Sequence, residues 1–168
     1  MINKTIGVIG CGNMGSELIK RLSGAVRRGR LMAYDADSAR RNAMRRYKAV
    51  IAKDNIALAK QCGVIILAVK PKDIEGLLGR IKKFITKDKL LISIAAGITT
   101  GYIERSLGGG AVVVRAMPNM PARIGEGISS LSRGTFAKGS DFKIAKEIFS
   151  KLGDVVQVDE DLVDAVTA

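Results

Sequence analysis

Three glycines near the start of the chain have the spacing of a loop that binds a dinucleotide. Gly10, Gly12 and Gly15 follow a short β-branched run and precede apolar residues at helical spacing. Such a turn lets the backbone approach a pyrophosphate, which the unpaired N–H groups at a helix start can bind. Gly10 would permit the tight turn, Gly12 would leave room for the phosphates, and Gly15 would let the helix lie close to its strand. Glycine loops also form simple turns, so the surrounding elements have to show whether this loop binds a dinucleotide.

Charged residues after the next apolar run bear on which dinucleotide binds. Asp35 lies 20 residues beyond Gly15, where an acid can accept hydrogen bonds from the adenosine ribose of NAD. Arg40 and Arg41 follow closely and could instead hold the 2′-phosphate of NADP, because guanidinium pairs with phosphate through two parallel hydrogen bonds. They could equally be solvated helix residues. The sequence therefore leaves NAD and NADP open as the cofactor.

Three further unusual segments come directly after apolar runs. They are residues 69–71, 95–97 and 117–121. Ligands of open parallel sheets bind beyond the carboxyl ends of the strands, so three such segments on one sheet edge indicate a pocket. The small residues Ala95, Ala96 and Gly97 would let a flat nicotinamide lie against the backbone, while two prolines would stiffen the last segment as a loop and expose Asn119.

Several kinds of chemistry are disfavoured by what the chain lacks. It has no histidine, and its two cysteines, Cys11 and Cys62, are not in a Cys-x-x-Cys arrangement. Histidine relays are thereby excluded, and a structural metal or a disulfide scaffold is not expected. The longest apolar run, residues 64–69, is too short to span a membrane, and the N-terminus lacks the layout of a signal peptide. We therefore expect a cytoplasmic protein with no membrane partner.

The net charge of +12 comes from 28 basic and 16 acidic residues. The basic residues concentrate in segments 27–30, 40–48 and 80–89. Most fall on the polar side of helical stretches, where they face water or attract phosphate groups. Aromatic residues make up 4% of the chain and do not alternate with the basic clusters as base-stacking platforms would. We do not expect a nucleic acid as the partner.

Strand and helix patterns alternate along the chain. Strands are expected at residues 6–9, 31–34, 64–69, 90–94, 111–116, 127–131 and 155–158. Between them, apolar residues recur at helical spacing. The residues placed to start these helices are Asn13, Asp37, Asp54, Pro71 and Thr99 or Thr100. Repeated strand–helix units predict an α/β fold, a Rossmann-type doubly wound and mostly parallel sheet with helices on both faces.

Five segments resemble the pyrroline-5-carboxylate reductase family, in sequence and in order. They are Gly10-Cys11-Gly12-Asn13-Met14-Gly15, Asp54-Asn55, Leu67-Ala68-Val69-Lys70-Pro71, Ser93-Ile94-Ala95-Ala96-Gly97-Ile98 and Val114-Arg115-Ala116-Met117-Pro118-Asn119-Met120-Pro121-Ala122. The last two are more specific than the glycine triplet, which many dehydrogenases share. The resemblance covers essentially the whole chain, and the tail 164–168 is similar to the junction at which the family continues into a helical dimerisation domain.

The resemblance implies roles for these segments. The pyrophosphate would be held by Gly10, Cys11, Gly12, Asn13, Met14 and Gly15, and the adenosine side by Asn55, Ala68, Val69, Lys70 and Pro71. The nicotinamide and the imine would be flanked by Ala95, Ala96, Gly97, Met117, Pro118 and Asn119. Asp35 and Arg40 complete the expected cofactor-binding set. No side chain of the chain is identified as catalytic.

The activity that the resemblance implies is hydride transfer from NAD(P)H to the C=N bond of 1-pyrroline-5-carboxylate, which gives L-proline. A cyclic imine can arrive protonated, so catalysis can rest on placing the nicotinamide C4 near the electrophilic carbon. This agrees with the absence of histidine. Met120 stands where the family usually has threonine, which exchanges a hydroxyl for a thioether among the expected substrate contacts.

The resemblance also implies a domain organisation. Residues 1–158 would form the NAD(P)-binding Rossmann domain, and residues 159–168 would begin a helix leading to a dimerisation domain that is not in this chain. We expect cofactor binding with little or no turnover from this chain, and a homodimer or larger homo-oligomer for the longer protein. Two alternatives stay open: another NADP-dependent reductase of the 3-hydroxyacid dehydrogenase type, and a non-catalytic module that senses dinucleotides or binds nucleic acid.

Overall fold

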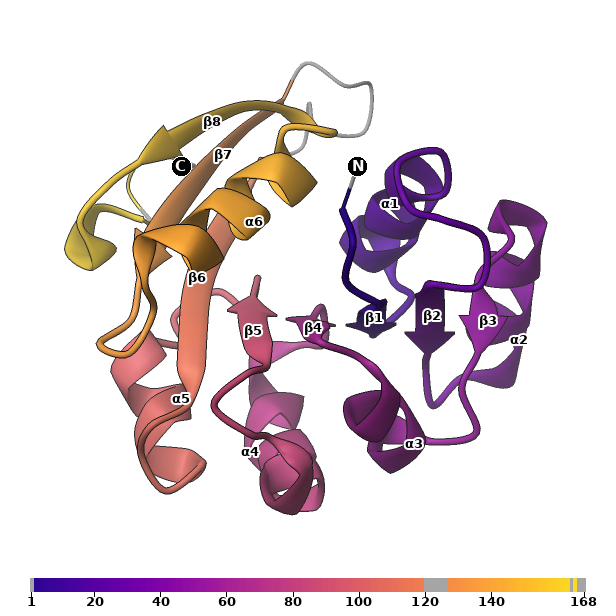
Figure 1. Cartoon of the computed structure of the whole chain (residues 1–168), viewed down its shortest axis with the longest axis horizontal. Coiled ribbons are helices and arrows are strands. Elements are labelled where there is room, and N and C mark those ends of the chain that lie inside the picture. The colour runs from indigo at the N-terminus through magenta and orange to yellow at the C-terminus, as the bar shows by residue number, and fades with distance from the viewer. Residues whose placement is uncertain (1, 120–126, 164, 166–168) are drawn as a thin grey trace.

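A single eight-stranded sheet organises the chain (Figure 1). The computed structural model describes residues 2–119, 127–163 and 165. The strands are β1 (Ile6–Ile9), β2 (Leu31–Tyr34), β3 (Val50–Ile51), β4 (Val64–Leu67), β5 (Leu90–Ser93), β6 (Val112–Pro118), β7 (Gly127–Arg133) and β8 (Gly153–Gln157). The helices are α1 (Asn13–Leu22), α2 (Ser38–Ala43), α3 (Asn55–Gln61), α4 (Pro71–Ile81), α5 (Thr100–Ser106) and α6 (Gly139–Phe149). Short 3₁₀ turns are η1 (Met44–Tyr47), η2 (Lys82–Phe84) and η4 (Glu160–Leu162).

The strand order creates a crevice beside β1. The order is β3-β2-β1-β4-β5-β6-β7-β8, so the chain runs outward from β1 to β3 and then returns to place β4 on the other side of β1. All paired strands are parallel except β6 and β7. Ligands of doubly wound sheets bind at such a reversal, beyond the carboxyl ends of the strands. The expected Rossmann-type fold is confirmed.

Helices cover both faces of the sheet, as expected (Figure 1). On one face, α1 and α6 bury Leu18, Ile19 and Phe149 against alternate residues of the strands. On the other face, α4 and its neighbours α3 and α5 bury residues such as Ile74 and Leu78. The central strands β1 and β4 are buried along their whole length, which accounts for the continuous apolar runs that predicted them.

The helices begin at the residues predicted from the sequence, except for α1. The Asp37 and Asp54 carboxylates and the Thr99 hydroxyl accept hydrogen bonds from N–H groups in the first turns of α2, α3 and α5. The N-cap of α1 is Gly12, with no side-chain hydrogen bond, so the prediction that Asn13 caps this helix is wrong. A glycine in this position leaves the helix N-terminus uncovered by any side chain of its own cap.

The strand β6 is longer than the sequence suggested. Met117 and Pro118 belong to it rather than to a loop, because β7 turns back antiparallel to β6 and pairs Pro118 with Ser129. A proline at a strand end removes only one donor from the ladder. The short strand β3 was not expected, and Met120 lies outside the described residues.

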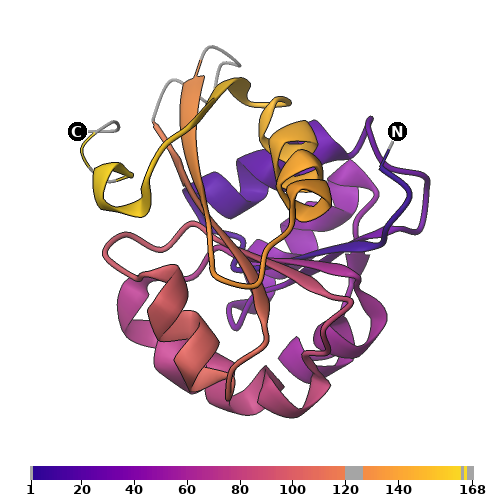
Figure 2. The same cartoon turned by 60° about the vertical axis from the view of Figure 1, so that its left-hand side comes forward.

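The C-terminal segment folds back onto the sheet. The described residues of the segment expected to begin a helix form the 3₁₀ turn η4, followed by the fully buried Val163. The Glu160 carboxylate accepts hydrogen bonds from the Thr100 N–H and hydroxyl, at 2.7 and 2.8 Å, and the Ser130 hydroxyl donates to the Val163 carbonyl oxygen. Figure 2 shows this segment, in yellow, on the opposite side of β7 from α6. Residues 164 and 166–168 lie outside the described residues.

Each helix that the structure describes is too short or too polar to span a membrane.

The Glu160 contact should hold the C-terminal segment in place. Replacing Glu160→Ala removes two charge-assisted hydrogen bonds, so we expect the free energy of unfolding to fall by about 1–3 kcal/mol. Urea denaturation measures this loss, and hydrogen exchange should show faster exchange at residues 160–163. The control Asp161→Asn, at an exposed position on the same turn, should change the stability by less than about 0.5 kcal/mol. Equal effects of the two substitutions would contradict a specific role for Glu160.

Candidate functional site

A cavity of about 1100 Å³ opens at the carboxyl ends of β1, β2 and β4. Its walls come from the glycine loop, the end of β2, the start of α3, the β4–α4 loop and one side of α4. The predicted cofactor-binding residues that line it are Gly10, Cys11, Gly12, Asn13, Met14, Asp35, Arg40, Asn55, Ala68, Val69 and Lys70. Gly15 and Pro71 lie just outside the lining. The structure therefore gathers segments from four separate parts of the chain around one space.

The three glycines of the loop have different constraints. Gly10 has φ of +99°, and a Cβ there would also meet the Ala68 carbonyl group. A Cβ on Gly15 would meet the Gly10 carbonyl oxygen. Gly12 has an ordinary φ of −70°, and a Cβ there would meet nothing within 4 Å. The fold thus requires glycine at positions 10 and 15, whereas at position 12 glycine leaves open a part of the cavity.

The N-terminus of α1 gives the cavity wall an affinity for anions. Gly12, Asn13 and Met14 line the cavity at this end, where the first N–H groups of a helix have no partner within the helix. The first turn of α1 carries no acidic residue that would compete for these groups. The helix dipole adds partial positive charge at the same point. A diphosphate is the ligand chemistry that such a wall fits best.

Asp35 ties the end of β2 to the glycine loop. Its carboxylate accepts hydrogen bonds from the Cys11 N–H at 2.6 Å and from the Asp37 N–H at 2.8 Å. Cys11 is buried, and burial raises the pKa of its thiol to about 12, with a smaller contribution from the nearby Asp35 charge. The thiol is therefore a neutral, packed group and not a nucleophile at ordinary pH.

The two arginines that the sequence left undecided have separate positions. Arg40 lines the cavity; its side chain is 59% exposed and lies 3.5 Å from the Asp37 carboxylate. Arg41 donates from Nη1 to the carbonyl oxygens of Asp35 and Ala36, both at 3.1 Å, and does not line the cavity. Arg40 is therefore the arginine of this pair that can reach a ligand in the cavity.

Asn55 brings a buried acceptor to the opposite wall. It is the first residue of α3, directly after the N-cap Asp54. Its Oδ1 atom is buried and has no hydrogen-bond partner among the described residues. Buried polar atoms in folded proteins nearly always have a partner, so this acceptor in the cavity wall is available to a donor from a ligand or a water molecule.

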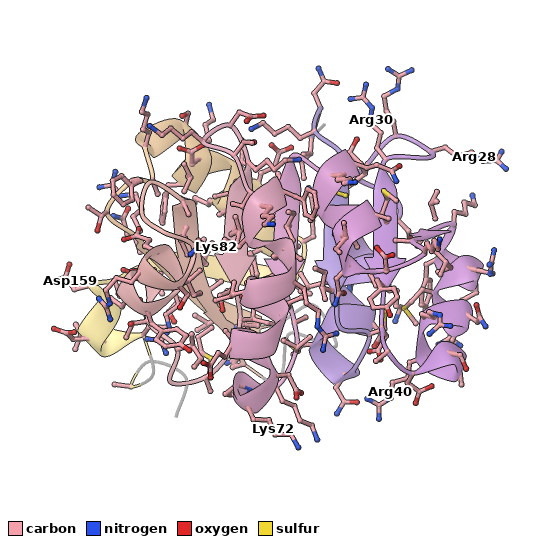
Figure 3. The ribbon with its side chains drawn as sticks, turned by 90° about the horizontal axis from the view of Figure 1, so that it is seen from below. Arg28, Arg30, Arg40, Lys72, Lys82 and Asp159 are labelled. Atoms are coloured by element: carbon pink, nitrogen blue, oxygen red, sulfur yellow. The ribbon has the colours of Figure 1, made fainter. Side chains whose placement is uncertain are left out.

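Helix α4 contributes a wall that the sequence analysis did not identify. Lys72, Asp73, Gly76, Leu77 and Arg80 line the cavity from successive turns of this helix. Their spacing of three to four residues places them on one side of the helix. Figure 3 shows Lys72 and Arg40 at one edge of the molecule, with Arg28 and Arg30 at the opposite edge. Arg40, Lys70, Lys72 and Arg80 thus bring basic side chains to the cavity lining.

The six residues expected around the nicotinamide and imine do not line this cavity. Ala95 is buried, while Ala96 and Gly97 are exposed in the turn after β5. Met117 and Pro118 end strand β6, and the half-buried Asn119 accepts a hydrogen bond from the Ile128 N–H, which keeps it in the β6–β7 ladder. Since β4, β5 and β6 are parallel, both segments still lie at the same sheet edge as the cavity.

Gly15 and Gly12 should respond differently to replacement by alanine. Gly15→Ala forces a Cβ against the Gly10 carbonyl group and should destabilise the fold by about 1–3 kcal/mol or more, as overpacking does. Gly12→Ala has open space and should cost less than about 1 kcal/mol, because only the helix cap changes. Thermal and urea unfolding of the two variants give the comparison. A stable Gly15→Ala variant would contradict the close packing of the loop.

The two buried thiols should make the stability depend on pH in the alkaline range. Burial raises the pKa of Cys11 and of Cys62 from the ordinary value of 9.0 to about 12. Above pH 9 the unfolded chain loses thiol protons that the folded chain keeps, so this contribution to stability is complete below pH 9 and is lost as the pH rises toward 12. Urea unfolding of the wild type should therefore show a steeper decline over this range than a Cys11→Ala/Cys62→Ala variant. Parallel curves would contradict the prediction.

Comparison with known proteins identifies relatives over nearly the whole chain. A family model described as NADP oxidoreductase coenzyme F420-dependent matches residues 5–97. A pyrroline-5-carboxylate reductase from Methanosarcina acetivorans is 39% identical over 170 residues, which span 99% of this chain and 63% of that protein. This chain thus spans less than two thirds of that relative's length.

Solved structures agree with these sequence relatives. A pyrroline-5-carboxylate reductase from Coxiella burnetii superimposes with a TM-score of 0.93 at 28% identity, over 98% of this chain and 63% of that one. The Plasmodium falciparum pyrroline carboxylate reductase, solved with NADP bound, gives a TM-score of 0.87 at 30% identity, over 98% and 61% of the two chains. The expected resemblance is confirmed along the chain. By its match over residues 5–97, the chain belongs to the family described as NADP oxidoreductase coenzyme F420-dependent.

Proposed function

We propose that the cavity binds NAD(P)H and that this chain is the cofactor-binding part of a pyrroline-5-carboxylate reductase. The observation that carries the proposal is the open space at Gly12, beside the N-terminus of α1. The fold itself does not need glycine there, so a ligand that approaches the backbone closely accounts for it. The similarity to pyrroline-5-carboxylate reductases along nearly the whole chain supports the choice of reaction.

The lining residues fit the parts of a dinucleotide. The pyrophosphate would bind at Gly12, Asn13 and Met14, the adenosine ribose at Asp35, and the adenosine side along Asn55 and the loop from Ala68 to Pro71. The exposed basic residues Lys70, Lys72 and Arg80 on the α4 side offset the negative charge of the phosphates. Asn55 Oδ1 would gain the donor that it lacks among the described residues.

Reduction of the C=N bond would require of this chain chiefly that it position the cofactor and the imine. When bound, NAD(P)H would supply a hydride from the nicotinamide C4 to the carbon of the C=N bond of a protonated imine, giving NAD(P)+ and an amine whose nitrogen keeps the proton. Residues of this chain would position the reactants: Ala95 to Gly97 and Met117 to Asn119, at the carboxyl ends of β5 and β6, would flank the nicotinamide and the imine. Positioning two reactants can supply a large part of the rate acceleration.

The relatives' greater length bears on the organisation of the whole protein. We propose that residues 1–158 form the cofactor-binding domain and that residues 159–168 lead to a second part that completes the substrate site and joins copies of the protein. The whole protein would then be a cytoplasmic homodimer or larger homo-oligomer. This chain alone would bind cofactor and show little or no turnover.

Cofactor titration tests the proposal. NADH or NADPH fluorescence, or calorimetry, should show saturable binding, and Gly12→Val should abolish it because the side chain would fill the space for the pyrophosphate. The matched control is Gly24→Val, the same substitution at another position with open space and outside the cavity. It should bind as the wild type does. If wild-type protein fails to bind at millimolar cofactor, or if Gly12→Val binds undiminished, the proposed site is wrong.

A further inference from the structure

Asp35 presents a fixed negative charge at the ribose end of the cavity. Each carboxylate oxygen accepts one backbone N–H, Oδ2 from Cys11 at 2.6 Å and Oδ1 from Asp37 at 2.8 Å. The two donors belong to different segments, the glycine loop and the turn after β2, so the carboxylate bridges them. Neither donor is a side chain that could swing away. The half-buried carboxylate therefore cannot turn out of the cavity wall without breaking both bonds.

No positive side chain neutralises this carboxylate among the residues that the structure describes. Arg40 lies 3.5 Å from the Asp37 carboxylate and forms its ion pair there. Arg41 donates hydrogen bonds from Nη1 to the carbonyl oxygens of Asp35 and Ala36. Its guanidinium lies 5.8 Å from the centre of the Tyr34 ring. The two arginines that could hold a phosphate thus contact the Asp37 carboxylate and two backbone carbonyl oxygens rather than the Asp35 carboxylate.

The carboxylate distinguishes a hydroxyl from a phosphate. A carboxylate has about four acceptor positions, of which the two backbone N–H groups occupy two. The remaining positions can accept hydrogen bonds from the ribose hydroxyls of NADH. The 2′-phosphate of NADPH has no hydrogen to donate when ionised and would bring like charge against a charge that is already fixed.

We infer that Asp35 determines cofactor specificity and makes the cavity selective for NADH over NADPH. The inference rests on the proposed function, since it concerns the same cavity. It goes beyond the relatives, because the family description and the Plasmodium falciparum structure name NADP. In this chain the carboxylate of Asp35, hydrogen-bonded to the Cys11 and Asp37 N–H groups, lines the cavity at the end of β2, where we propose that the adenosine ribose binds.

The first experiment compares the dissociation constants of NADH and NADPH for the same protein by calorimetry. Juxtaposed like charges disfavour binding, so NADH should bind at least about tenfold more tightly than NADPH. Equal affinities, or tighter binding of NADPH, would overturn the inference and leave the proposed function standing. Absence of binding by either cofactor would instead refute the proposed function, and the specificity with it.

Two substitutions then test the role of each charge. Asp35→Asn removes the charge and keeps one acceptor oxygen for the two backbone N–H donors, so the preference for NADH should shrink toward equal affinities. Asp37→Asn keeps a good helix cap and releases Arg40 from its ion pair. It should strengthen NADPH binding and leave NADH binding unchanged. Melting temperatures check that both variants fold. If Asp35→Asn does not fold, the ratio of the NADH and NADPH dissociation constants of the wild type and the effect of Asp37→Asn still test the inference.

Arg40→Ala tests the alternative that Arg40 binds the 2′-phosphate of NADPH and makes the cavity prefer that cofactor. If Arg40 holds a 2′-phosphate in the wild type, the alanine variant should lose NADPH affinity about tenfold, as the loss of a charge-assisted contact would predict. If Asp35 already excludes the phosphate, the variant should change the two dissociation constants alike. A selective loss of NADPH binding in Arg40→Ala, with no effect of Asp35→Asn, would refute the assignment.

Discussion

The packing of backbone against backbone in the glycine loop is the constraint on which the site depends. Gly15 lies directly against the Gly10 carbonyl group, and Gly10 against the backbone at Ala68, so β1, α1 and the end of β4 meet without side chains between them. This contact sets where α1 begins and aims its N-terminus along the crevice between β1 and β4. Any wider residue at these two positions would move the helix and with it the wall of the cavity.

Much of this arrangement could be predicted from the sequence, for identifiable reasons. Continuous apolar runs gave the central strands because β1 and β4 are buried on both faces, and Asp37 and Asp54 marked helix starts because their caps are local interactions. The position of the cavity beside the glycine loop and Asp35 followed from their spacing, because the strand–turn–helix unit alone sets where these residues lie. The roles of the residues in binding remain predictions.

The parts that sequence reasoning missed depend on long-range contacts. The extension of β6 through Pro118 needs β7 as an antiparallel partner, and the packing of the tail needs Glu160 to meet Thr100 across 60 residues. The wall formed by α4 was overlooked for another reason. Its apolar stripe accounts for the buried side of the helix, whereas Gly76 and Arg80, on the cavity side, look like ordinary surface residues until the glycine loop is placed opposite them.

The hydrogen bond between the Cys11 N–H and the Asp35 carboxylate joins the loop at which we propose that the phosphates bind to the group at which we propose that the ribose binds. Because one side chain serves both, the two ends of the cavity are energetically coupled, and substitutions at them should not act additively. Evolution of a new coenzyme preference on this scaffold is thereby constrained. A residue at position 35 that allows a ribose with a different substituent to bind must also accept the hydrogen bond from the Cys11 N–H. Otherwise a second substitution has to restore the conformation of the glycine loop.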